Sequence, residues 1–336
     1  MTMPKVSFVV AIYGVEDYME QCVRSLYGQT LEDIEIVLVD DCTPDRSMEI
    51  AIRTLEEYPH RKEHVKVVRH EKNRGTREVR KSGIAVATGE YVINVDGDDW
   101  VEEDMAKSMY AKAKEVDADM VLCGFWWYGQ KDRRYRMPVP VDALGGTEAI
   151  RDATLSRRGW PNVWCRMIKR EILASDNMVW PVADHTEDVV ITTVATYYSK
   201  TIAFTEDSLY HYRYNPHSIT NVGEKSHLLK RYLDFVQNNE LLTDFYERNG
   251  LNEKYRQGMI VNKSFARNEL LSLTGSRKYR KMWRRTYPEL NRMMLWGSTY
   301  REKIWVVAVS LGLYPWCKRF LLSKRLRPAA VWRKGA

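Results

Sequence analysis

The sequence lacks the features of secreted, disulfide-bonded and membrane-spanning proteins. Its five cysteines, Cys22, Cys42, Cys123, Cys165 and Cys317, have no paired spacing, which argues against a disulfide framework or a zinc site and favours a reducing compartment. Its start has neither the basic segment nor the long apolar core of a signal peptide. The apolar stretch near the C-terminus has about 14 residues between cations, whereas a membrane-spanning helix needs about 20. These absences predict a cytoplasmic protein.

Internal repeats and low-complexity segments are also missing. The 336 residues, 44% hydrophobic and 29% charged, have the composition of a globular protein with one large or two ordinary domains. Acidic residues are scarce in residues 251–336, which hold 20 Lys and Arg against four Glu, whereas residues 1–250 carry a net charge of −9. We therefore expect a mildly acidic front and a strongly basic C-terminal region with different partners.

The first 130 residues alternate between strand and helix patterns. Strands are expected at 6–12, 35–39, 65–68, 91–95 and 120–127, with helices between them at 16–27, 47–55, 77–87 and 104–116. This alternation predicts an α/β fold, a mostly parallel central sheet with helices on both faces. Ligands of such sheets collect beyond the carboxyl ends of the strands. Strand-like pieces and a helix beginning near Thr186 follow, and the chain from about residue 223 is predicted to be helical.

An acidic cluster closes the fourth expected strand. Asp96, Asp98 and Asp99 lie within four residues, directly after an apolar run. Three like charges at a strand end are costly unless a cation neutralises them. Mg2+ and Mn2+ take oxygen ligands, often one or two carboxylates completed by substrate phosphates. The cluster therefore predicts a metal site in which a phosphorylated substrate supplies some of the ligands. A solvated turn after the strand is the alternative.

Polar residues also follow the first two strands. Asp40 and Asp41 close the second strand, where one carboxylate could accept a hydrogen bond from a nucleobase imide and the other from a ribose hydroxyl. Capping of the next helix is the alternative for Asp41, and it is the interpretation we favour for Asp45. Tyr13 closes the first strand, where its ring either lines a base pocket or packs in the interior.

A basic cluster lies between the third and fourth strands. Arg77, Arg80 and Lys81 share one face of a predicted helix, and Arg74 precedes it. These cations either bind diphosphate oxygens or form an exposed basic face.

Taken in order, these segments resemble the family 2 glycosyltransferases with the GT-A fold. The similarity covers about residues 5–100 in the correct order and continues to about residue 220. The segments that carry it are Val9-Val10-Ala11-Ile12-Tyr13, Gln29-Thr30, Val39-Asp40-Asp41-Cys42-Thr43, Asp45, Asn73-Arg74-Gly75, Arg80, Gly83, Gly89-Glu90-Tyr91, Val95-Asp96-Gly97-Asp98-Asp99, Val163-Trp164, Lys169-Arg170-Glu171, Glu187-Asp188, Tyr212-Arg213 and Ser218-Ile219-Thr220.

The resemblance implies a metal-dependent hexosyltransferase that transfers a sugar from a nucleoside-diphosphate donor with inversion at the anomeric carbon. UDP-sugars are the favoured donors, and the acceptor is a glycan or a lipid-linked glycan in polysaccharide or glycoconjugate biosynthesis. The residues that would bind the nucleotide-sugar are Ala11, Tyr13, Asp40, Asp41, Arg80, Asp96 and Asp98. Asp96 and Asp98 match the DXD-type acids that contact the ribose and the Mn2+ or Mg2+ ion, and Asp99 is expected to support them.

Asp188 matches the catalytic base of the family. Thr186 would cap its helix, and Glu187 and Asp188 would occupy the first turn, where the helix dipole would keep Asp188 ionised. His185 and His211 lie near these residues, but we expect both to be packed or surface histidines.

The chain departs from the family pattern at three places. Ala11 and Gly14 stand where Pro and Asn are usual, Cys42-Thr43 where Gly-Ser is usual, and Arg80-Lys81 where an Arg-Asn pair is usual. These changes leave the detailed geometry of the donor pocket open.

The basic C-terminal region, residues 221–336, is expected to follow a catalytic domain at 1–220. Trp305 and Trp316 flank its apolar stretch, and further cations follow: Lys318, Arg319, Lys324, Arg325 and Arg327. This pattern suits a helix at the inner surface of the cell membrane. Packing on the catalytic domain or on a second subunit, as in a homo-oligomer, is the alternative. No nucleic-acid-binding motif accompanies the tail.

Two other functions are compatible with parts of the sequence. A nucleotidyltransferase with the GT-A fold would carry a glycine-rich phosphate loop with a lysine after the first strand, and Ala11-Ile12-Tyr13-Gly14-Val15 has none. An NDP-sugar-binding or scaffolding protein would tolerate a decayed site, and the presence of Asp96, Asp98 and Asp188 argues against that.

Overall fold

The computed structural model describes residues 3–129, 133–139, 145–216, 218, 225–291, 309 and 311–314. The chain divides into two compact units. The first comprises Met1–Asn221 and Leu241–Gly258, and the second comprises Val222–Glu240 and Met259–Ala336.

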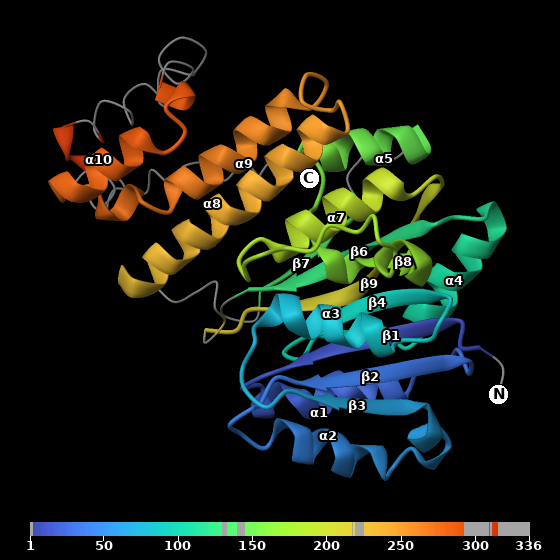
Figure 1. The fold of residues 1–336 in the computed structure, drawn as a ribbon. Coiled ribbons are helices and arrows are strands. Elements are labelled where there is room, and N and C mark those ends of the chain that lie inside the picture. The colour runs from blue at the N-terminus through green and yellow to red at the C-terminus, as the bar shows by residue number, and fades with distance from the viewer. Residues whose placement is uncertain are drawn as a thin grey trace. The chain divides into compact units, whose positions relative to one another are not determined.

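A nine-stranded mixed sheet forms the centre of the first unit (Figure 1). Its first four strands are parallel, in the order β3 (Val65–Arg69), β2 (Ile34–Asp40), β1 (Val6–Ile12) and β4 (Tyr91–Asp96). The sheet continues through β8 (Arg166–Lys169), β6 (Met120–Tyr128), β9 (Ile202–Arg213) and β5 (Trp100–Val101), while β7 (Arg134–Met137) pairs with β6. Because β8 is antiparallel to both β4 and β6, the carboxyl ends of β4 and β6 point the same way.

Helices cover the sheet because its strands are apolar on both faces. Six of the seven residues of β1 are buried. Alternate residues of β1, from Val6 to Ile12, join a core with α1 (Glu16–Tyr27), α2 (Ser47–Leu55) and α4 (Met105–Val116). Val9 points to the other face, where it meets Gly83 of α3 (Thr76–Val86) so closely that an added Cβ would lie 2.3 Å from its side chain. Further helices are α5 (Gly146–Leu155), α6 (Arg170–Leu173) and α7 (Glu187–Tyr198).

The strands and helices expected in the first 130 residues are confirmed. Later the structure differs in three places. The expected strand at 163–168 is a 3-10 turn, Val163–Cys165, followed by β8. The two strand-like pieces around 202–214 are one strand, β9, and the short strands β5 and β7 were not expected. β5 has only two residues and exists through its pairing with β9, so no local pattern could reveal it.

Helices make up the described part of the second unit, as expected. α8 (Lys225–Arg248) contributes residues 225–240 to it, and α9 (Arg256–Asn268) contributes residues from 259 onward. α10 (Arg277–Arg285) packs into a small core with Tyr232, Leu270 and Val309. Of the expected surface helix only residues 309 and 311–314 are described, and its cations from Lys318 to Arg327 lie outside the described residues. Over the part of the chain that is described, no helix is both long and apolar enough to cross a membrane.

Candidate active site

The predicted site residues of the first strands meet at one edge of the sheet. In the parallel register, Asp40 of β2 lies opposite Ile12 of β1, and Asp96 of β4 lies opposite Ala11. The carbonyl of Ala11 accepts a hydrogen bond of 3.0 Å from Gly97 N–H. A Cβ on Gly97 would lie 2.7 Å from that carbonyl oxygen. The residue between Asp96 and Asp98 therefore has to be glycine.

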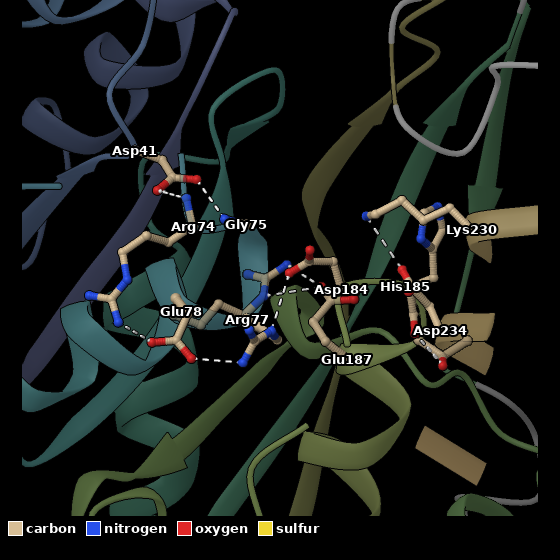
Figure 2. Close-up of polar contacts among 12 residues, drawn as sticks. Asp41, Arg74, Gly75, Arg77, Glu78, Asp184, His185, Glu187, Lys230 and Asp234 are labelled. Carbon is tan, nitrogen blue, oxygen red and sulfur yellow. Dashed lines mark hydrogen bonds and ion pairs between the residues drawn. The ribbon is translucent and has the colours of Figure 1, made fainter. Parts of the chain in front are cut away.

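The acid pair after β2 is tied into the protein. Asp41 is buried, and its Oδ1 accepts a hydrogen bond from Arg74 N–H (2.8 Å) and lies 2.6 Å from Nδ1 of His70. Its Oδ2 accepts a hydrogen bond from Gly75 N–H at 2.9 Å (Figure 2). Asp41 therefore holds the segment before α3, and its contact with the nucleoside stays a prediction. Asp40 is partly buried, and its Oδ1 accepts a hydrogen bond of 2.9 Å from Thr43 N–H.

The loop after the pair is joined to the loop that carries Tyr13. Thr43 Oγ1 accepts a hydrogen bond from Gly14 N–H (2.9 Å) and donates one to Asp45 (2.7 Å). Asp45 also accepts hydrogen bonds from the N–H groups of Glu16 and Ser47, the first residues of α1 and α2. Its role at the start of α2 was favoured from the sequence, whereas its role at α1 was not foreseen. Tyr13 is 49% exposed, which excludes packing in the interior and leaves its ring available to a ligand.

Cys42 has a left-handed backbone, with φ of +59°. Residues with a Cβ disfavour this region, whereas glycine adopts it freely. The glycine that is usual at this position in the family therefore has a conformational reason, and the chain keeps the loop geometry with cysteine there.

The acids after β4 are much less well satisfied. Asp99 is fully buried and accepts hydrogen bonds from the Tyr210 hydroxyl (2.8 Å) and Arg213 N–H (2.7 Å). Burial, followed by the charges of Asp98 and Asp96, raises the pKa of Asp99 well above its ordinary value. Burial and then Asp96 also raise the pKa of Asp98, against a hydrogen bond of 3.0 Å from Asn215 Nδ2.

This donor set fits a hard divalent cation. The acids supply carboxylate oxygens, and a cation would offset the burial and the neighbouring negative charges that raise the pKa values of Asp98 and Asp99. Within the described residues, no three acid, histidine or cysteine side chains form a complete cage. An ion bound here would therefore need phosphates and water as its other ligands.

Arg80 connects the acids after β4 to the start of α7. Its buried guanidinium donates through Nη2 to Asp96 Oδ1 (2.9 Å) and to Glu187 Oε1 (3.3 Å), and Nε lies 3.4 Å from the same Glu187 oxygen. Burial lowers the pKa of Arg80, but Asp96, Glu187 and Asp188 outweigh it, so the net pKa is raised. Arg80 Nη1 is buried and has no hydrogen-bond partner among the residues that the structure describes.

The other members of the basic cluster do not reach these acids. Arg74 and Arg77 form ion pairs of 2.7 and 2.8 Å with Glu78 (Figure 2), and Lys81 is exposed. Of the predicted basic cluster, Arg80 therefore is buried at the site, whereas Arg74, Arg77 and Lys81 point away from it.

The first turn of α7 places Asp188 beside this arginine. Thr186 does not cap the helix as expected, because its backbone is left-handed (φ +66°) and its hydroxyl donates to the His185 carbonyl. The expectation that Asp188 is ionised stays a prediction, and burial acts against it. Burial raises the pKa of Asp188, and the cations of Arg157 and Arg80 oppose the rise.

Two residues that the sequence reasoning did not assign belong to this group. Glu187 is buried, and burial together with Asp188 raises its pKa while Arg80 lowers it. Arg157 follows α5 with a left-handed backbone (φ +62°), and within the described part of the chain its buried Nε has no hydrogen-bond partner. The pair Glu187-Asp188 signalled Glu187, whereas nothing local signals Arg157.

The two histidines are packed, as expected. His185 is buried. His211 stacks on Trp100 with ring centroids 4.7 Å apart, and its nitrogens lie 2.8 Å from Glu102 and 3.0 Å from the Tyr128 hydroxyl.

Comparison with known proteins gives a consistent result. The model of the family "Glycosyl transferase family 2" matches residues 7–175. The uncharacterized glycosyltransferase EpsJ of Bacillus subtilis (strain 168) is 36% identical over 241 residues, which are 68% of each chain. The uncharacterized glycosyltransferase YibD of Escherichia coli (strain K12) is 29% identical over 267 residues, 78% of this chain and 75% of that protein.

The fold is shared with solved glycosyltransferase structures. Residues 1–349 of S. aureus TarS in complex with UDP-GlcNAc superpose with a TM-score of 0.67 at 18% identity, covering 95% of this chain and 92% of that one. The predicted GT-A fold followed by a helical C-terminal region is confirmed.

Proposed function

The chain belongs to glycosyl transferase family 2, and from that premise we propose that it transfers a sugar from a nucleoside-diphosphate sugar to a glycan or lipid-linked acceptor, with inversion at the anomeric carbon. The observation that carries the proposal is the Arg80 bridge. It brings Asp96 and Glu187, 91 residues apart in the sequence, to one buried guanidinium at the edge of the sheet. UDP-sugars are the favoured donors, which the UDP-GlcNAc complex of TarS supports.

The nucleoside end of the donor is assigned to the ends of β1 and β2. Tyr13 offers an exposed ring for stacking, and Ala11 presents a short side chain beside it. Asp40 has a carboxylate near the sheet edge for the base or ribose, and Asp41 orders the loop that closes this side.

The diphosphate end is assigned to Asp96, Asp98 and Arg80. Asp96 and Asp98 would hold Mn2+ or Mg2+, which, when bound, stabilises the charge on the departing diphosphate. The unpartnered Nη1 of Arg80 is suited to donate to a phosphate oxygen or a hydroxyl of the donor sugar.

Asp188 is assigned as the general base. Direct displacement with inversion needs one base, which removes the proton of the acceptor hydroxyl as its oxygen bonds to the anomeric carbon and the bond to the diphosphate breaks. A raised pKa suits this role, because a base works best when its pKa lies near the operating pH. Glu187 acts as a positioning residue, since it holds Arg80 from the adjacent position of α7.

The remaining parts of the chain are assigned more broadly. We place the catalytic domain within residues 1–220 and give residues 221–336 to acceptor, membrane-surface or oligomer contacts. The protein would then work in the cytoplasm, peripherally at the inner face of the membrane, in polysaccharide or glycoconjugate synthesis.

The test combines donor binding with turnover. Thermal shifts are measured with UDP-, GDP- and dTDP-sugars, with and without Mn2+, and donor consumption is followed for the wild type and for Asp188→Asn. The variant should bind the donor normally and lose transfer by roughly a thousandfold or more. Asp176→Asn makes the same chemical change at an exposed position and serves as the control. Donor binding without turnover by the wild type would indicate a binding protein, and unchanged turnover by Asp188→Asn would refute the base assignment.

A further inference from the structure

The outward surface of α10 is strongly basic, and two exposed leucines flank Gly312, which lies close to Arg280 of the same helix. We propose that this basic surface, made by the exposed cations of α10 with Leu311 and Leu313, docks the protein on an anionic membrane. The inference rests on the membrane-surface role proposed above for residues 221–336, but it does not depend on the sugar-transfer chemistry.

The cations of α10 are gathered on one side of the helix. The nine residues Arg277–Arg285 include six Lys or Arg and no acid. Five of the six are exposed: Arg277, Lys278, Lys281, Arg284 and Arg285. Their spacings of one, three, four, seven and eight residues place them on one helical face.

The orientation of this face is set by the opposite side of the helix. Tyr279 and Trp283 are buried in the core of the second unit. The guanidinium of Arg267 lies 3.4 Å from the centre of the Trp283 ring. Arg280, the sixth cation, turns back and donates to the carbonyls of Thr274 (2.9 Å) and Gly275 (2.8 Å). The helix is therefore held with its five other cations directed away from the core.

Two exposed leucines lie next to this helix. Leu311 is 65% exposed and Leu313 is 47% exposed. Gly312 between them is so close to Arg280 that an added Cβ would lie 2.2 Å from its Nη1. Exposed apolar side chains beside a polybasic face are what a lipid headgroup boundary accepts, since cations attract anionic lipids while apolar groups enter the acyl boundary. A soluble polyanion would bind the cations but offer the leucines no apolar partner. The combination of cations and leucines therefore favours a membrane.

The test is sedimentation of the full-length protein with vesicles of phosphatidylcholine alone and of phosphatidylcholine with phosphatidylglycerol. We expect binding only to the anionic vesicles, weakening as salt rises. The variant Arg277→Gln, Lys278→Gln, Lys281→Gln, Arg285→Gln should bind about 600-fold more weakly, because each of the four cations contributes about a factor of five near an anionic surface. Leu311→Ser with Leu313→Ser should weaken binding and leave most of the salt dependence.

A matched control neutralises four cations of the C-terminal tail: Lys318→Gln, Lys324→Gln, Arg325→Gln and Arg327→Gln. This variant should keep more binding than the α10 variant. The proposal is overturned if the wild type ignores anionic vesicles, or if only the tail variant loses binding. It is also overturned if soluble dextran sulfate binds as tightly as the vesicles and the leucine variant behaves as wild type. Thermal melting of each variant checks its folding, and donor binding, measured in parallel, separates failure here from failure of the proposed enzyme activity.

Discussion

Two pairs of neighbouring aspartates end parallel strands at the same edge of the sheet, yet their surroundings differ. Asp41, after β2, receives two backbone hydrogen bonds and the close contact of His70. Asp98 and Asp99, after β4, also accept hydrogen bonds, but burial and the charges of neighbouring aspartates raise the pKa of both. The first pair is stabilised by the protein itself, whereas the second is suited to completion by a positive charge from outside.

The difference has a direct energetic meaning. A carboxylate that accepts several hydrogen bonds stabilises the folded chain, and its removal leaves buried donors without partners. Buried carboxylates that repel one another cost stability when ionised, so their presence points to a ligand that compensates them. Substitution of Asp98 should therefore lower activity and leave stability intact, whereas substitution of Asp41 should mainly lower stability.

The largest effect is expected at Asp98. Asp98→Asn removes a proposed metal ligand, and we expect transfer with Mn2+ to fall about a hundredfold to a thousandfold, the scale seen when one electrostatic stabiliser of a transition state is lost. Without metal the variant should be at least as stable as the wild type, because it removes a buried, repelled charge. Full Mn2+-dependent activity in this variant would contradict the metal assignment.

Asp41 should show the reverse pattern. Asp41→Asn replaces an accepting oxygen with an amide NH2 group that faces donors, and we expect the free energy of unfolding in urea to fall by about 2–4 kcal/mol. Asp40→Asn is the control and should lose less, because its amide oxygen can still accept the one backbone hydrogen bond, from Thr43 N–H. Equal stability of the Asp41 and Asp98 variants would remove the distinction between the two pairs.

Arg157 extends the comparison to the acids of α7. Its cation opposes the rise in the pKa of Asp188, so Arg157→Gln should raise that pKa further. A base acts only when ionised, so activity is lost as pH falls through its pKa. The acidic limb of the kcat/KM profile should therefore move to higher pH, and activity at a fixed pH on that limb should fall about tenfold each time the pKa rises by one.

Arg158→Gln, at the exposed neighbouring position, is the control for this profile. An unmoved acidic limb in the Arg157 variant would show that the two charges are not coupled in the working enzyme.

The smallest effect is expected at Cys42. Cys42→Gly places at φ +59° the residue that tolerates this backbone, and we expect about 1 kcal/mol of added stability with transfer nearly unchanged. Thermal melting measures the gain. A loss of stability would mean that the cysteine side chain makes a compensating contact.

Much of the fold and of the site's outline was readable from the residues. The apolar runs at 6–12 and 91–95 predicted buried strands, and the order of the acids after them predicted which side chains share an edge, because carboxyl ends of parallel strands lie together. The capping role of Asp45 was also correctly favoured, since Asp before a helix is a local signal. The short strand β5 could not be foreseen, because its pairing partner is more than a hundred residues away.

The sequence by itself determined the α/β fold, the family and the set of acids from which a site could be made. Only the tertiary structure decided which partners each of those acids has. It assigned the carboxylate of Asp41 to the segment at 70–75, brought Arg80 between Asp96 and Glu187, and placed Arg157 near Asp188. The physical reason is that periodicity and spacing act over a few residues, whereas desolvation and charge pairing depend on which distant side chains share a buried volume.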